Sequence, residues 1–189
     1  MVLTPSSMMP LGKRAPNFKL LDVTTDEWVT LKDIESDIGT VVIFICNHCP
    51  YVKHLIGPLT SFAKEYILKG ISFVAINSND ISKYPEDRPE KMVEFAEKFD
   101  FPFPYLFDST QKVAKEYGAT CTPDIFLFDE SLECVYRGQF DDSRPGNAIP
   151  VSGKDLADAL DALIEGKEIS QDQSPSIGCN IKWIETAKG

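Results

Sequence analysis

Cys46 and Cys49 carry the clearest chemistry in this sequence, because two thiols separated by two residues can close a small disulfide ring. Positions three apart share one face of a first helical turn. A helix N-terminus stabilises a thiolate and lowers the pKa of such thiols to roughly 3.5–7.5. We therefore predict thiol–disulfide exchange, in which Cys46, expected to be the more exposed thiol, attacks and Cys49 resolves the mixed disulfide.

Three neighbours of the pair, Asn47, His48 and Pro50, are expected to support it. A positive charge on His48 would favour the Cys46 thiolate and make the couple more oxidising; the alternative is a surface histidine without influence. A proline disfavours helical geometry in the residue before it, so the regular helix is expected to begin at Pro50. That start leaves Cys46 farther from the helix dipole.

Metal binding and inert packing are the competing interpretations of the pair. A zinc site usually recruits a second cysteine pair or two spaced histidines, and both histidines of this chain, His48 and His54, lie in this one segment. Cys46, Cys49 and His54 could instead hold copper(I), which favours thiolates. Redox chemistry is favoured over both. The redox-active disulfide is then the reacting group, and neither a cofactor nor a metal is expected.

The pair is expected to lie where a buried strand ends and an amphipathic helix begins, a place where reactive groups gather in open α/β sheets. Apolar runs predict strands over residues 41–45, 71–76 and 124–128, with weaker candidates at 18–21, 28–31, 105–107 and 134–136. Helical spacing of apolar residues predicts helices after Pro50, Pro89 and Asp108 and from about Lys154. Pro58 is expected to kink the first of them.

This order of elements predicts a three-layer α/β/α sandwich with a mixed central sheet. We expect a single domain over residues 1–189, with an N-terminal strand extension over 1–35 and a C-terminal tail over 170–189. The polar loop 141–147 and the tail from Gln171 onward are the least core-like stretches.

The composition narrows the partners. A formal net charge of -10 argues against nucleic acid and against anionic membranes, both of which attract clustered cations. Neither a secretory leader nor an apolar stretch long enough to span a bilayer is visible, so a cytoplasmic protein is expected. The expected partners are proteins that carry a disulfide or dithiol, together with a reductant. The identity of that reductant and the oligomeric state of the protein stay open.

Two segments resemble the thioredoxin superfamily: the Cys-x-x-Cys run and the later Thr122-Pro123 pair that opens a strand. Residues 46–53 (CNHCPYVK) and 175–183 (PSIGCNIKW) look more closely like a bacterial redoxin subfamily. That subfamily is related to alkyl hydroperoxide reductase and thiol-specific antioxidant proteins. The opening residues 10–18 are similar to the start of such redoxins. The resemblance covers nearly the whole chain and implies a thioredoxin-like fold.

The resemblance also implies a cis bond before Pro123, packed against the active disulfide. Backbone beside a cis Thr122–Pro123 bond could pair with an extended substrate segment by strand addition. Two features depart from thioredoxin: Ile45 replaces the usual tryptophan, and the buried acid beneath the disulfide would fall near Thr40. Proton transfer therefore needs another group or bulk water.

Hydroperoxide reduction is the alternative activity, because related redoxins include peroxiredoxins. Those enzymes carry a Pro-x-x-x-Thr-x-x-Cys pattern, which precedes neither Cys46 nor Cys49 here. A tuned peroxidase is therefore disfavoured, although an exposed thiolate reacts with peroxide.

The chain has five cysteines, three of them outside the pair. Cys134 is expected to be a small buried apolar residue. Cys121 precedes Thr122-Pro123 and Cys179 lies in the tail motif, so we hypothesise that one of these two is an auxiliary thiol that relays the disulfide.

Overall fold

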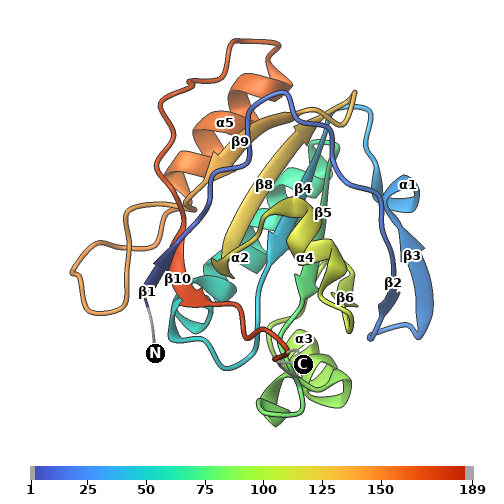
Figure 1. Ribbon diagram of the computed structural model, residues 1–189. Coiled ribbons are helices and arrows are strands. Elements are labelled where there is room, and N and C mark those ends of the chain that lie inside the picture. The colour runs from blue at the N-terminus through green and yellow to red at the C-terminus, as the bar shows by residue number, and fades with distance from the viewer. Residues whose placement is uncertain (1–2, 186–189) are drawn as a thin grey trace.

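The computed structural model describes residues 3–185 and is built around a mixed seven-stranded sheet, in the order β3-β2-β6-β5-β4-β8-β9 (Figure 1). The strands are β2 (Lys19–Asp22), β3 (Glu27–Thr30), β4 (Gly39–Phe44), β5 (Ile71–Asn77), β6 (Tyr105–Phe107), β8 (Asp124–Asp129) and β9 (Cys134–Gly138). β5 runs parallel to β4 and β6, and the other pairs are antiparallel.

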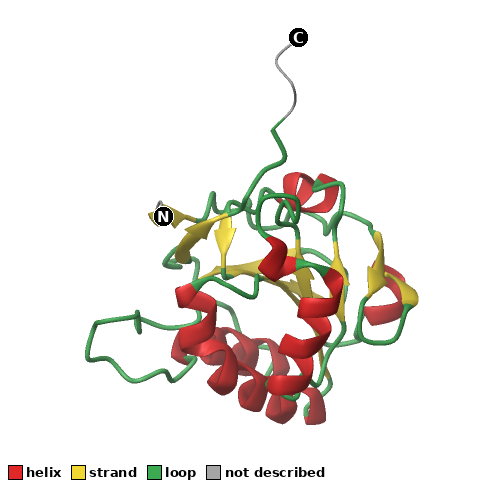
Figure 2. Ribbon diagram, turned by 90° about the horizontal axis from the view of Figure 1, so that it is seen from below, coloured by secondary structure: helices red, strands yellow, loops and turns green. Residues whose placement is uncertain are grey.

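Helices cover both faces of this sheet (Figure 2). They are α1 (Leu31–Ile34), α2 (Pro50–Leu68), α3 (Pro89–Lys98), α4 (Lys112–Tyr117) and α5 (Lys154–Ile164), with a 3-10 turn, η1, at Pro85–Asp87. Alternate residues of a strand face opposite sides, so Val41 and Ile43 of β4 pack with α2, α3 and α5, whereas Val42 and Phe44 pack with α1 and α4. The predicted thioredoxin-like sandwich with a mixed sheet is confirmed.

Local patterns located the large elements well. Each of the seven predicted strands has a counterpart in the central sheet, shifted by a residue or two at its ends. The helices after Pro50 and Pro89 begin at those prolines, where the missing N–H costs nothing. α2 continues through Pro58 as one assigned helix. None of the described helices is long and apolar enough to cross a membrane.

A second, three-stranded sheet lies beside the first and was not predicted. Its strands are β1 (Leu3–Pro5), β10 (Ile177–Asn180) and β7 (Cys121–Thr122), antiparallel in the order β1-β10-β7. Figure 1 shows β1 and β10, from the two ends of the chain, side by side. The description of the tail as poorly core-like is wrong here, because Cys179 and Ile181 are buried. β10 is short and pairs with segments that are distant in the sequence. The burial of this region therefore leaves no periodic pattern of apolar residues in the sequence.

Candidate active site

The cysteine pair lies between β4 and α2, as predicted. Cys49 immediately precedes Pro50, the first residue of α2. The Thr122–Pro123 bond is cis, also as predicted. Cys46 Sγ lies 3.3 Å from Thr122 Oγ1, and Cys49 Sγ lies 3.2 Å from the Thr122 carbonyl oxygen. The fold therefore brings both sulfurs against the loop that precedes the cis-proline.

Both thiols are buried, with 1% of Cys46 and none of Cys49 exposed. The expectation that Cys46 is the exposed thiol at the tip is therefore wrong. Thr122 packs against Cys46 from the cis-proline loop, and an oxygen of Asp87 and a ring nitrogen of His48 lie within 4.8 Å of its sulfur. Cys46 is thus buried mainly by residues distant in the sequence, which the local sequence around the pair does not reveal.

The pKa values of the two thiols are shifted in opposite directions. Its pKa is lowered to about 5 because its thiolate accepts a hydrogen bond from Cys46, against the cost of burial, and a further one from Cys179. The pKa of Cys46 is raised well above its ordinary value by its hydrogen bond to Cys49, then by burial and by the charge of Asp87. These opposite directions favour a thiolate at Cys49 over one at Cys46 in the reduced site.

His48 is held in place by Asp87, a residue that no local sequence pattern marks. His48 Nδ1 lies 2.7 Å from Asp87 Oδ2, and the His48 ring stacks on Tyr84 with centroids 5.4 Å apart. The pKa of His48 is raised, mainly by the hydrogen bond to Asp87, and burial opposes the shift. His48 is therefore fixed close to Cys46. This position favours the interpretation that His48 influences the thiols over the alternative that it is an uninvolved surface residue.

Asp87 organises the loop between the cysteines as well. Its buried carboxylate accepts the backbone N–H of Asn47 at 2.7 Å and the side-chain amide of Asn79 at 2.8 Å. Asn47 in turn accepts the Tyr105 hydroxyl at 2.9 Å and donates to the Glu86 carbonyl at 2.8 Å. Asn47 therefore supports the site by fixing the Cys-x-x-Cys turn.

Thr40 stands where the resemblance to thioredoxin would place a buried acid. Its hydroxyl accepts a hydrogen bond from the Ser36 backbone N–H.

The alternative copper set of Cys46, Cys49 and His54 is not among the clusters of potential metal ligands in residues 3–185. His54 Nε2 hydrogen-bonds to Ser143 Oγ at 2.8 Å, in the loop after β9. Within residues 3–185, one other combination, Cys46 with His48 and Asp87, has its ligand atoms within 4.8 Å of one another. The short His48–Asp87 hydrogen bond already joins two of those three side chains.

The remaining cysteines differ in their surroundings. Cys179 Sγ lies 2.7 Å from Cys49 Sγ. Cys121 faces backbone carbonyls, those of Pro123 at 3.4 Å and Ser176 at 3.9 Å, and burial raises its pKa. Cys134 is buried in β9 as expected.

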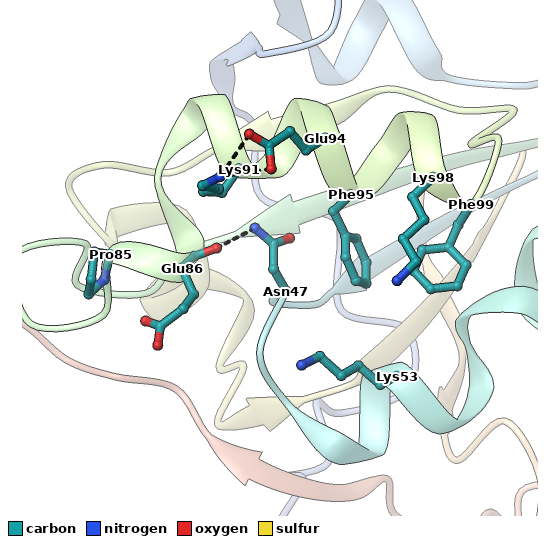
Figure 3. A pocket seen from close by; sticks show the side chains of 9 residues that line it. All are labelled: Asn47, Lys53, Pro85, Glu86, Lys91, Glu94, Phe95, Lys98 and Phe99. Atoms are coloured by element: carbon teal, nitrogen blue, oxygen red, sulfur yellow. Dashed lines mark hydrogen bonds and ion pairs between the residues drawn. The ribbon is translucent and has the colours of Figure 1, made fainter.

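An open groove of about 660 Å³ runs beside Asn47, between the start of α2 and α3 (Figure 3). Its lining combines the rings of Phe95 and Phe99 with the amines of Lys53 and Lys98, and Lys91 pairs with Glu94 at 2.8 Å. Neither cysteine lines it. Asn47 is the residue that this groove shares with the Cys-x-x-Cys turn.

Comparison with known proteins places this geometry in a family. The model of the AhpC/TSA family matches residues 11–137, more than half of the chain. The chain belongs to the AhpC/TSA family. The match includes the cysteine pair, the cis-proline and Asp87, and ends before β10 and Cys179. A search of curated proteins found no match.

Solved structures share the fold of this chain. An uncharacterized conserved protein from Geobacillus kaustophilus is 56% identical, with 99% of each chain covered and a TM-score of 0.97. The thioredoxin domain of a thiol-disulfide oxidoreductase from Bacteroides vulgatus is 18% identical (69% and 89% covered, TM-score 0.58). Peroxidoxin BcpB from Mycobacterium tuberculosis is 22% identical (84% and 98% covered, TM-score 0.61). The last two show the shared thioredoxin-like fold.

Proposed function

We propose that this AhpC/TSA family protein catalyses thiol–disulfide exchange through Cys46 and Cys49. The observation that carries the proposal is a Cys-x-x-Cys pair whose two sulfurs both lie against a cis-proline loop, with a lowered pKa at Cys49. A thiolate is the nucleophile in disulfide exchange, and its partner thiol resolves the mixed disulfide. Family membership supports the same chemistry.

The shared proton of the pair fits the roles predicted from the sequence. When the Cys46 proton moves along the hydrogen bond to Cys49, Cys46 becomes the thiolate and attacks a substrate disulfide, releasing one substrate thiolate. Cys49 then gives up that proton to the released thiolate and attacks Cys46 Sγ. The Cys46–Cys49 disulfide forms, the second substrate sulfur leaves, and the substrate has gained two electrons. His48, close to Cys46, stabilises the negative charge on that sulfur.

Exchange is tested by reduction of a protein disulfide such as that of insulin, with dithiothreitol as electron donor. Cys46→Ser and Cys49→Ser are each expected to bring turnover down to the uncatalysed rate, because the internal disulfide can no longer form. Cys134→Ser is the matched control, since Cys134 is equally buried but contacts the Tyr136 carbonyl, away from the pair. Unchanged turnover in Cys46→Ser would refute the proposal.

Hydroperoxide reduction is a second candidate, favoured by the burial of both sulfurs, which a small oxidant reaches more easily than a protein segment. A thiolate converts a hydroperoxide to an alcohol or water and becomes a sulfenic acid, which the second thiol condenses to a disulfide. Turnover of hydrogen peroxide with dithiothreitol, exceeding turnover of insulin, would favour it. Stoichiometric zinc or copper in the purified protein, lost in Cys46→Ser, would favour metal binding instead.

The lowered pKa of Cys49 gives a pH prediction. Thiolate absorbance at 240 nm, taken as wild type minus Cys49→Ser, is expected to rise through a step at about pH 5. The ordinary thiol pKa lies higher, at about 8.5, so the thiolate stabilises the folded state fully above that pH. This contribution is lost as the pH falls through about 5. A step near pH 8.5 would contradict the assignment of the charge to Cys49.

A further inference from the structure

The backbone edge at Thr122 is occupied by the protein's own chain. β10 pairs with β7 so that Cys179 lies opposite Thr122 and Asn180 opposite Cys121, and the Ile181 N–H donates to the Thr120 carbonyl at 3.0 Å. This edge is the one that could, from the sequence, pair with an extended substrate segment. That expectation is wrong for the described state, because the C-terminal strand takes the place of a substrate strand.

β10 presents a cysteine where such a strand would present its reacting group. Side chains alternate along a strand and opposed residues share a face, so Cys179 points to the same side as Thr122, toward the pair. Its sulfur lies 2.7 Å from Cys49 Sγ, about 0.7 Å longer than a disulfide bond. Both side chains are buried, so no solvent layer separates the two sulfurs.

Gly178 permits this approach. A Cβ atom at position 178 would lie 2.0 Å from the Thr122 carbonyl oxygen and 2.6 Å from its carbon. Only a residue without a side chain lets the two backbones come this close, and the closeness carries Cys179 to Cys49.

We propose that β10 is an internal substrate strand and that Cys179 is a third redox thiol, which takes the disulfide over from the pair as a Cys49–Cys179 bond. This inference rests on the proposed exchange activity and extends it to a residue beyond the family match. Cys49, in contact with both Cys46 and Cys179, is the sulfur common to the two disulfides.

The transfer balances without an added oxidant or reductant. Starting from the Cys46–Cys49 disulfide, the Cys179 thiolate attacks Cys49 Sγ; the Cys49–Cys179 bond forms and the Cys46–Cys49 bond breaks. The electron pair goes to Cys46, which takes up the proton that Cys179 released. In the reduced site, burial and the Cys49 thiolate raise the pKa of Cys179 to about 12. The charge on Cys49 is absent once it is in a disulfide, so Cys179 ionises more readily at the stage where it must attack.

Disulfide mapping of the whole protein tests the transfer. Wild type is oxidised with diamide at pH 8, free thiols are alkylated, and tryptic peptides are analysed by mass spectrometry. Cys49 and Cys179 fall in different tryptic peptides, so their bond appears as a linked pair, whereas Cys46–Cys49 stays within one peptide. We expect the linked pair in wild type and, as the main product, in Cys46→Ser.

Matched variants separate the possible results. Cys179→Ser and Cys179→Ala are expected to lose the linked pair and keep the Cys46–Cys49 bond, whereas Cys121→Ser and Cys134→Ser keep both. Oxidised wild type with the Cys46–Cys49 bond alone, together with free Cys179 in Cys46→Ser, would overturn the third-thiol proposal and leave the proposed function standing. Absence of any disulfide after oxidation would overturn both.

Discussion

Asp87→Ala is expected to destabilise the protein by about 3–5 kcal/mol, the cost of removing one partner from a buried ion pair. The carboxylate is fully buried and receives hydrogen bonds from the Asn47 backbone, the Asn79 amide and His48. Alanine leaves these donors without an acceptor, and each unpaired buried donor is costly. Urea unfolding measures the loss, and NMR titration should show the pKa of His48 falling toward its ordinary value.

Glu86→Ala is the control for Asp87→Ala. Glu86 directly precedes Asp87, and its replacement by alanine removes the same charge. Its side chain is exposed, and it contacts Asn47 through its backbone carbonyl, which alanine keeps. A change within about 0.5 kcal/mol is expected for this surface substitution. Equal effects of the two substitutions would show that net charge, and not the buried network, sets the stability.

Gly178→Ala is expected to force β10 away from the cis-proline loop and to cost about 2–3 kcal/mol, as overpacking of a close contact does. The new methyl group would meet the Thr122 backbone at 2.0 Å, and backbone cannot swing aside as a flexible side chain does. Displacing β10 separates Cys179 from Cys49. Native-state alkylation with iodoacetamide should therefore label Cys179 faster than in wild type, where 2% of it is exposed.

Gly57→Ala provides the matched glycine control. Nothing lies within 4 Å of a Cβ at position 57, which is inside α2. Alanine there is expected to stabilise the helix by up to about 1 kcal/mol and to leave Cys179 labelling unchanged. Wild-type stability and labelling in Gly178→Ala would mean that the contact between β10 and Thr122 relaxes without consequence.

Features fixed by neighbouring residues were predictable from the sequence. The spacing of Cys46 and Cys49, the proline at the start of α2 and the Thr122-Pro123 pair carry their information within a few positions. The apolar runs that became β4, β5 and β8 lie in the middle of the sheet, where burial on both faces leaves a strong signal. These local signals were enough for the fold and for the position of the thiol pair.

Features created by long-range contacts were not predictable. Asp87 lies 39 residues from His48, and Cys179 lies 130 residues from Cys49. An acidic residue in a charged loop carries no mark of a distant partner. Cys179 was one of two candidate auxiliary thiols, and its motif did not separate it from Cys121. A contact of the same long range, from Thr122, buries Cys46. The pKa of Cys49 is lowered chiefly by its neighbour Cys46 and further by the distant Cys179.

The meeting of β1 and β10 beside the cis-proline loop has a consequence for biosynthesis. The ribosome synthesises β10 after all strands of the central sheet, so the backbone edge at Thr122 stays unpaired until that point. A nascent chain halted before residue 177 would expose β7, and its Cys49 would lack a neighbour on one side. The edge at Thr122 is therefore paired, and Cys49 gains Cys179 as a neighbour, only after residues 177–180 have been synthesised.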